Sequence, residues 1–183
     1  AARLADHMVE GHTQGDADKV AKYDDKLGFL TPILKGFLTE LGQEAAHLGM
    51  QVFGGHGYIR EHGMEQIVRD TRIATLYEGT TGIQALDLLG RKVLLMTRGG
   101  AVREFTLKIA NFARKQLTDP RLRPFALELL KLSGQWNLLT LRILLGARKD
   151  RDLVGAAAHD FLMYSGYVTM AYLWLRQATV AAD

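Results

Sequence analysis

The chain has 183 residues, of which 48% are hydrophobic and 23% charged, and its formal net charge is +3. It can bury a core as one domain or as two small packed units. Basic and acidic residues are interleaved, as in 148–152, which argues against the basic patch of a nucleic-acid-binding protein. The absence of cysteine excludes disulfides, thiolate metal sites and a thiol nucleophile.

Metal and membrane binding are not predicted. His7 and His12, and likewise His56 and His62, do not have the spacing of a zinc site on one helix face. The longest uncharged run, 161–175, is shorter than the about 20 residues that span a bilayer, and we interpret it as a buried helix. The chain starts inside a helical pattern, so we expect a fragment of a longer protein.

The first part of the chain predicts a short helix, a loop and a long helix. Residues 2–10 have helical periodicity, and the polar stretch 11–25 predicts a loop. Thr31 followed by Pro32 is typical of a helix start. The next apolar residues recur at helical spacing and predict one buried stripe: Ile33, Phe37, Leu41, Ala45, Leu48 and Val52. Three glycines within this helix each destabilise it by up to about 1 kcal/mol relative to alanine, which close helix packing would justify: Gly36, Gly42 and Gly49.

Glycines at 54–57 predict the end of the long helix, because glycine tolerates irregular turns. A shorter helix is predicted over 64–73, and the stretch 74–77 is left unassigned. Thr81 and Gln84 match a capping box, so a third helix should begin there. Its inner face is predicted to carry Ile83, Leu86, Leu89, Val93 and Met96.

A second helical unit is predicted after the break at 97–100, with helices over 102–117, 125–148 and 153–180. No segment alternates as a strand does, so we predict an all-α fold, a helical bundle followed by a second helical bundle. The domains are predicted as 1–98 and 99–183. The aromatic residues of the second unit fit a core better than a pocket: Trp136, Tyr164, Tyr167, Tyr172 and Trp174. Arg142 and Arg148 fit solvated helix charges as well as a phosphate contact.

Glu78 stands between an apolar run, 74–77, and the glycine- and threonine-rich stretch 79–82. A carboxylate just before a helix N-terminus gains about 0.3–1 kcal/mol from the helix dipole, so an ordinary surface charge explains it. The same position favours the ionised form that a general base needs, if Ile73, Leu76 and Tyr77 exclude water from it. From these residues alone the capping role is the more common one, and both interpretations stay open.

Three motifs in order resemble one known family. Residues 51–58, then 68–73, then 77–80 with 83–84, are similar to the C-terminal helical domain of flavin-dependent acyl-CoA dehydrogenases. The resemblance covers about residues 2–93, so the first predicted domain is identified as a partial domain of this type. The helical extension after it resembles the branch of the family with an appended C-terminal domain.

The resemblance implies an enzyme that uses FAD to oxidise an acyl-CoA. In the family, the glutamate at the place of Glu78 removes the α-proton of the thioester while the β-hydrogen leaves as hydride to flavin N5. The backbone N–H of this glutamate also holds the thioester oxygen. The match at Gly79 implies room for the thioester, and Tyr77 is expected to contact substrate as well.

The FAD contacts implied by the resemblance lie in two places. Thr80 is expected at the flavin beside Glu78, and Gln51, Gly54 and Gly55 are expected at the FAD of a neighbouring subunit. Many members have glutamine where this chain has Gly82, which puts that single contact in doubt.

The family resemblance also implies partners. We expect an electron-transfer flavoprotein or a similar acceptor, a homodimer or homotetramer, a cytoplasmic location and a role in fatty acid metabolism. The chain alone is expected to be inactive, because upstream domains of the family carry most of the flavin pocket. Two alternatives are an acyl-CoA oxidase, whose flavin is reoxidised by oxygen, and a non-catalytic helical oligomerisation module.

Overall fold

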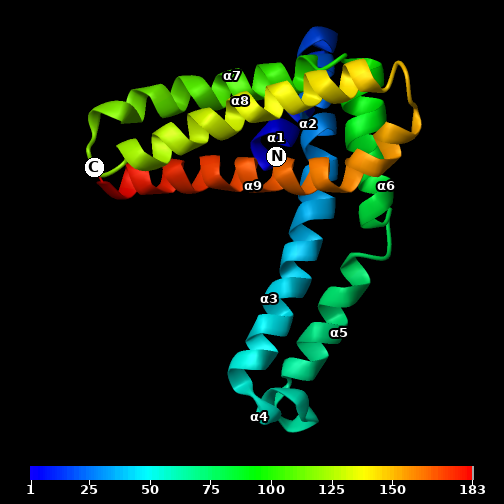
Figure 1. The fold of residues 1–183 in the computed structure, drawn as a ribbon, viewed down its shortest axis with the longest axis vertical. Helices are drawn as coiled ribbons and strands as arrows, with labels where there is room; N and C mark the ends of the chain where they lie inside the picture. The colour runs from blue at the N-terminus through cyan, green and yellow to red at the C-terminus, as the bar shows by residue number, and fades with distance from the viewer. Residues whose placement is uncertain (183) are drawn as a thin grey trace.

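The computed structural model describes residues 1–182 as helices joined by short turns (Figure 1). The predicted all-α fold is confirmed, since the protein is 87% helical and its described residues contain no strand. The first helices are α1 (Ala2–Gln14), α2 (Ala17–Pro32), η1 (Ile33–Phe37, a π-helical turn), α3 (Leu38–Phe53), α4 (Gly55–Tyr58), η2 (Arg60–His62) and α5 (Met64–Ala74). The others are α6 (Thr81–Leu86), η3 (Asp87–Met96, π-helical), α7 (Gly100–Lys115), η4 (Gln116–Thr118), α8 (Arg123–Gly146) and α9 (Asp152–Ala182).

The helices are arranged as a body and an arm. In Figure 1, α7, α8 and α9 lie side by side and cross the α2 end of the long continuous helix that α2, η1 and α3 form. Helices α3, α4 and α5 project away from them as a hairpin. We call residues 38–74 the arm. One continuous core fills the body, from Phe29 and Ile33 in the first half of the chain to Trp136 and Leu162 in the second. The predicted boundary between residues 98 and 99 stays a prediction.

The predicted loop over 11–25 and the predicted helix start at Thr31 are wrong. Helix α2 begins after Asp16, whose carboxylate accepts a hydrogen bond from the backbone N–H of Lys19 at 2.8 Å. Gly15, with φ 68°, forms the short turn before it. The polar residues that suggested a loop form the end of α1 and the start of α2, and most of them are exposed. Pro32 lies within a continuous helix that passes into η1.

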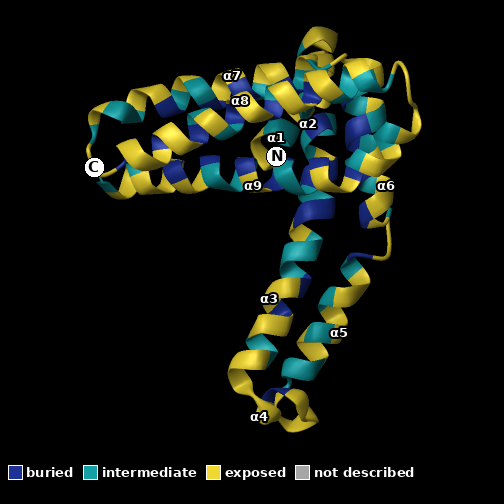
Figure 2. Cartoon of the chain, in the orientation of Figure 1, coloured by how far each residue is buried: buried dark blue, intermediate teal, exposed yellow. Residues whose placement is uncertain are grey.

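Only the N-terminal part of the predicted apolar stripe is buried. Ile33 and Phe37 are each 2% exposed, whereas Leu48 and Val52 are 60% and 86% exposed. The reason is that α3 leaves the body and packs on α5 through a different face, whose buried residues are Gln43 and Ala46. Figure 2 shows the arm largely exposed along its length.

Two of the three glycines in the long helix are closely packed against other helices. A Cβ atom at Gly36 would lie 2.6 Å from Leu162 Cδ2 of α9, and one at Gly49 would lie 2.9 Å from Met64 Cε of α5. A Cβ atom at Gly42 would meet no atom within 4 Å, so close packing does not explain that glycine.

The predicted inner face of the third helix is partly wrong. Leu89 and Val93 are buried, but three other members are 45–58% exposed: Ile83, Leu86 and Met96. The buried face also holds Ala85 and Leu88. From Asp87 to Met96 the helix is π-helical, so its turns hold more residues than the 3.6 that the prediction assumed. This spacing moves Met96 off the buried face. Ile83 and Leu86 lie before the π-helical segment, in α6, whose buried residues are Thr81 and Ala85.

The three helices predicted after residue 100 are confirmed as α7, α8 and α9. Of the aromatic residues expected in their core, Trp136 and Tyr172 are buried, but Tyr167 and Trp174 are 50% and 59% exposed. Arg142 and Arg148 are exposed. Among residues 1–182, no helix has the length and hydropathy of a membrane span.

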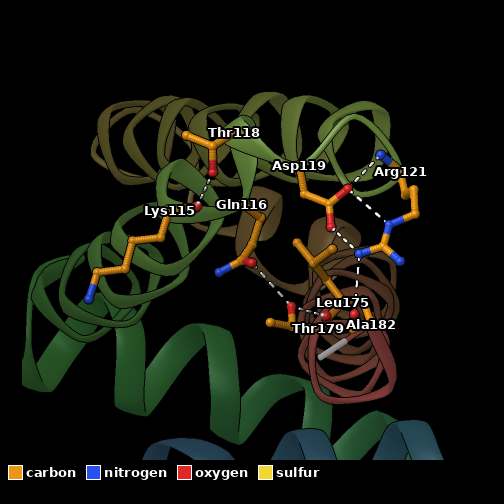
Figure 3. A network of polar contacts seen from close by, with 8 residues as sticks. All are labelled: Lys115, Gln116, Thr118, Asp119, Arg121, Leu175, Thr179 and Ala182. Atoms are coloured by element: carbon orange, nitrogen blue, oxygen red, sulfur yellow. Dashed lines mark hydrogen bonds and ion pairs between the residues drawn. The ribbon is translucent and has the colours of Figure 1, made fainter.

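Polar contacts fasten the end of α9 to the turn between α7 and α8 (Figure 3). Thr179 Oγ1 donates to Gln116 Oε1 at 3.3 Å. The guanidinium of Arg121 donates to Asp119 Oδ2 at 2.8 Å and to the carbonyl oxygen of Ala182 at 3.3 Å. These contacts hold the last turn of α9 close to the far end of the helical body.

Candidate active site

Glu78 lies in the turn between α5 and α6, where the arm returns to the body (Figure 1). Its φ is 53° and that of Gly79 is 91°, so both residues adopt left-handed backbone conformations. This conformation destabilises a residue other than glycine by about 1–2 kcal/mol. It persists only where the surrounding structure holds it, and such places are concentrated at functional sites.

Side chains from the following helix hold this turn. Gln84 Nε2 donates to the carbonyl oxygen of Glu78 at 3.2 Å, and Thr80 Oγ1 accepts from the backbone N–H of Ile83 at 3.5 Å. The helix cap is therefore Thr80, and the predicted capping box of Thr81 and Gln84 is wrong. Thr81 is buried and donates its hydroxyl to Glu40 of α3, which leaves the capping position to its neighbour.

The described residues do not shield Glu78 from water. Ile73, Leu76 and Tyr77 are 55%, 50% and 51% exposed, and Glu78 is exposed as well. The expected apolar enclosure of the carboxylate is therefore not formed within residues 1–182, since about half of each of these side chains is exposed.

The predicted FAD contacts at the tip of the arm are far from Glu78. Gln51 is at the end of α3, and Gly54, with φ 59° and ψ −141°, forms a turn that glycine adopts readily. Gly55 follows in α4, and all three residues are exposed. Helix α5 separates them from Glu78, and an α-helix rises about 1.5 Å per residue. The structure brings Tyr77, Gly79 and Thr80 next to Glu78, but not these three.

Cavities occur elsewhere on the protein. The first, of about 580 Å³, lies between α2, η3 and α7 and is lined by Phe29, Lys92 and Phe105 among others. Another, of about 500 Å³, lies between α3 and α5, and one of about 320 Å³ lies between α3 and α9; both are lined by Gln43 and His47 among others. Glu78 lines none of these three. In the part of the chain that the structure describes, no group of His, Asp or Glu side chains is arranged to hold a metal ion.

Two residues that contact the Glu78 turn were not predicted from the sequence. Lys35 donates hydrogen bonds to backbone carbonyls of the turn, and Glu40 accepts one from Thr81. Both lie more than 35 residues upstream, as the separations of 39, 44 and 41 residues in these bonds show, and neither belongs to a motif. The only signal for Lys35 is a lysine between apolar residues on a helix face that carries the core.

Comparisons with known proteins match both halves of the chain. Residues 1–94 match the family described as acyl-CoA dehydrogenase, C-terminal domain. Residues 105–183 match the family described as acetyl-CoA dehydrogenase C-terminal like.

Similar curated proteins include three from bacteria. A 3-methylmercaptopropionyl-CoA dehydrogenase from Ruegeria pomeroyi is 48% identical over 107 residues, which are 58% of this chain and 17% of that protein. A broad-specificity linear acyl-CoA dehydrogenase from Mycobacterium tuberculosis is 31% identical over 172 residues, 91% of this chain and 28% of that protein. A subunit of a caffeyl-CoA reductase-Etf complex from Acetobacterium woodii is 38% identical over 56 residues, 31% of this chain and 15% of that protein. The chain thus spans less than a third of the length of each.

Proposed function

The chain belongs to the acyl-CoA dehydrogenase family, and from this premise we propose that it supplies the C-terminal helical part of an FAD-dependent enzyme. The proposed reaction removes hydrogen from the α and β carbons of an acyl-CoA thioester. Its support is the match of both halves of the chain to C-terminal regions of the family and the names of the relatives, which are dehydrogenases of acyl-CoA esters.

We assign the abstraction of the α-proton to Glu78. The observation that carries this assignment is the left-handed backbone of Glu78, held in a turn by Gln84 and Lys35. A general base must be ionised and held within hydrogen-bond reach of the proton that it takes. The turn supplies the fixed position, and the exposed carboxylate is accessible to a thioester.

The backbone N–H of Glu78 is proposed to stabilise the charge that develops on the thioester oxygen. Within residues 1–182 this N–H donates to no protein acceptor, so it is available to a substrate. A backbone donor aimed at a developing oxyanion is worth several kcal/mol of barrier, about 2.7–4 where one has been removed. Gly79 is proposed to leave space for the thioester, and Tyr77 to contact the acyl group.

FAD, when bound, accepts the β-hydrogen as hydride. We propose that Thr80 contacts the flavin beside Glu78, and that Gln51, Gly54 and Gly55 contact an FAD bound by a second subunit. Helix α5 separates Thr80 from Gln51, Gly54 and Gly55. This separation supports the proposal that the two groups of residues contact FAD molecules bound by different subunits. A Cβ atom at Gly54 or Gly55 would meet nothing within 4 Å, so the backbone there is open to a ligand.

This division requires more than one subunit, and we propose a homodimer or homotetramer. The exposed apolar side chains of the arm support an interface there: Leu48, Val52, Phe53, Tyr58 and Ile59. As electron acceptor we propose an electron-transfer flavoprotein, since one relative is a subunit of a complex named for such a protein. A cytoplasmic location and a role in fatty acid metabolism are part of the same proposal.

The test is the Glu78→Gln variant of the full-length protein. It should keep its yellow flavin and lose its bleaching by acyl-CoA, because an amide cannot accept the α-proton, and removal of a general base slows a reaction about 10²–10⁴-fold. Glu128→Gln on α8, an exposed carboxylate paired with Lys131, is the matched control and should bleach normally. Unchanged bleaching in Glu78→Gln would refute the assignment.

Two further measurements separate the alternatives. The 183-residue chain with FAD, an acyl-CoA and an artificial electron acceptor should show no turnover, because its described residues leave Glu78 open to water. Turnover would contradict the proposal that other domains complete the site. Peroxide formation by the full-length protein would favour an acyl-CoA oxidase, and the absence of any flavin reduction would favour a non-catalytic helical module.

A further inference from the structure

Lys35 joins the long helix to both ends of the turn that carries Glu78. Its Nζ donates hydrogen bonds to the carbonyl oxygens of Ala74, at 2.8 Å, and Gly79, at 2.7 Å. Ala74 is the last residue of α5, and Gly79 directly follows Glu78. One ammonium group therefore spans the whole turn between the two carbonyls.

The body of the protein holds Lys35 in place. Lys35 is half-buried in η1, between Ile33 and Phe37, which are each 2% exposed. Its Nζ also lies 5.8 Å from the centre of the Tyr77 ring, within the range of a cation–π contact. The lysine thus extends from a helical segment that packs in the core, whereas residues 76–78 of the turn that it contacts are exposed.

The charged ammonium group of Lys35 binds backbone carbonyl oxygens, not carboxylates. No carboxylate among residues 1–182 forms an ion pair with it, and an ammonium has three N–H donors. Hydrogen bonds to charged donors are shorter and stronger than those between neutral groups. Both of its hydrogen bonds restrain the course of the turn.

Gln84 restrains the same turn from its other side. Its Nε2 donates to the carbonyl oxygen of Glu78, and a Cβ atom at Gly79 would lie only 2.6 Å from this Nε2. The absence of a side chain at Gly79 therefore makes room for the bond. Side chains from η1 and α6 together hold two successive carbonyl groups, those of Glu78 and Gly79.

We propose that Lys35 is a positioning residue for the dehydrogenation. By holding the carbonyls of Ala74 and Gly79, it fixes the direction in which the carboxylate and the backbone N–H of Glu78 face the substrate. This inference rests on the proposed role of Glu78. Lys35 itself contacts neither substrate nor flavin in this proposal, and acts through the turn.

The test compares three variants of the full-length protein. Lys35→Met keeps an unbranched apolar stem of similar length and removes the donors, and Lys35→Arg keeps a cation with several N–H donors. Lys92→Met is the matched control, because Lys92 is a half-buried lysine that lines the cavity between α2 and α7. The measurements are FAD content, kcat, KM and the rate of flavin reduction by acyl-CoA in a single turnover.

Lys35→Met is expected to slow flavin reduction about 100-fold, since a small misplacement of a catalytic group has an effect of this size. KM and FAD content should change less than threefold, because the binding contacts remain. Lys35→Arg should stay within tenfold of the wild type, and Lys92→Met should match it. In the 183-residue chain, Lys35→Met should also speed amide hydrogen exchange at Leu76 and Tyr77, whose N–H groups donate to the Ile73 carbonyl beside the Ala74 carbonyl that Lys35 holds.

A purely structural lysine would give a different result. Lys35→Met would then lower thermal stability or FAD content while each flavin-bound molecule was reduced at the normal rate, and that outcome would overturn the inference. If Lys35→Met does not hold FAD, Lys35→Gln replaces it with the same expectation and the same contrary result. Loss of activity in Glu78→Gln with normal reduction in Lys35→Met refutes only the role of Lys35, whereas normal reduction in Glu78→Gln refutes the proposed function itself.

Discussion

The ring of Phe37 lies directly on the backbone of Gly166. A Cβ atom at Gly166 would be 2.1 Å from Phe37 Cγ, far inside van der Waals contact. Phe37 belongs to η1 and Gly166 to the middle of α9, so this contact ties the helix that leads into the arm to the last helix of the chain. The edge of the Phe37 ring also meets Tyr167, with ring centres 4.9 Å apart.

Substitution of Gly166 by alanine should destabilise the protein. The added methyl group must displace the buried Phe37 ring, and overpacking of a core destabilises by about 1–3 kcal/mol. Urea unfolding of the 183-residue chain, followed by circular dichroism, measures this effect. Gly134→Ala in α8 is the control, because its Cβ would meet nothing within 4 Å and should stabilise the helix by about 0.5–1 kcal/mol. Equal unfolding free energies for the two variants would contradict the packing described here.

Substitution of Thr81 by valine should destabilise the junction between the arm and the body. The Thr81 hydroxyl donates to the carboxylate of Glu40, and a hydrogen bond to a charged group contributes about 1.5–3 kcal/mol. Thr81→Ser keeps the hydroxyl and should lose less than half as much. The midpoint of thermal unfolding measures both variants. A valine variant as stable as the wild type would mean that water replaces the threonine hydroxyl at Glu40.

The sequence predicted the positions of the helices that have a clear helical periodicity. The helices near 64–73, 125–148 and 153–180 were predicted within a few residues, because each has a clear start and a clear end. The helix starting at Ala17 was missed, since its buried residues are few and its exposed face is rich in aspartate and lysine. Thr31 with Pro32 has the local pattern of a helix start, but the core contacts of Phe29 and Ile33 continue the helix through it.

The sequence predicted where the candidate site lies, but it did not predict the contacts that hold the backbone of the site in place. The motif around Glu78 indicated the position of the carboxylate, because the residues next to it carry the signal. Gln84, which also holds the turn, lies next to it in the sequence, whereas the contacts from Lys35 and Glu40 come from residues that precede it by a whole helical hairpin. The exposure of Leu48 and Val52 was not predictable either, since periodicity identifies an apolar face but not what covers it.

The pKa of the Asp119 carboxyl should lie below that of an ordinary aspartate. Hydrogen bonds from the Arg121 side chain and then from its backbone N–H hold the pKa of the Asp119 carboxyl below its ordinary value. A carboxyl with a lowered pKa in the folded state stabilises that state above its unfolded pKa, and this contribution is lost as the pH falls through the folded pKa. Because the group is exposed, the effect on stability should be small.

Carbon-13 NMR titration of the Asp119 carboxyl measures this directly. Arg121→Met should raise the midpoint towards that of an ordinary aspartate, and Arg123→Met, two residues on in α8, should leave it unchanged. A midpoint unaffected by Arg121→Met would mean that the bond at 2.8 Å is not maintained in solution.

The arm should open more readily than the body of the protein. Helix α5 has no buried residue, whereas α9 has eight: Ala158, Phe161, Leu162, Ser165, Gly166, Val168, Tyr172 and Leu175. Local opening free energy follows buried apolar contact, so amides of 64–74 should exchange with solvent much faster than those of 158–175. Hydrogen exchange of the 183-residue chain, read by mass spectrometry, checks this, with α8 as an internal reference. Equal protection of α5 and α9 would show that arm and body unfold as one unit, and the exposed face of the arm would then need no partner surface to become ordered.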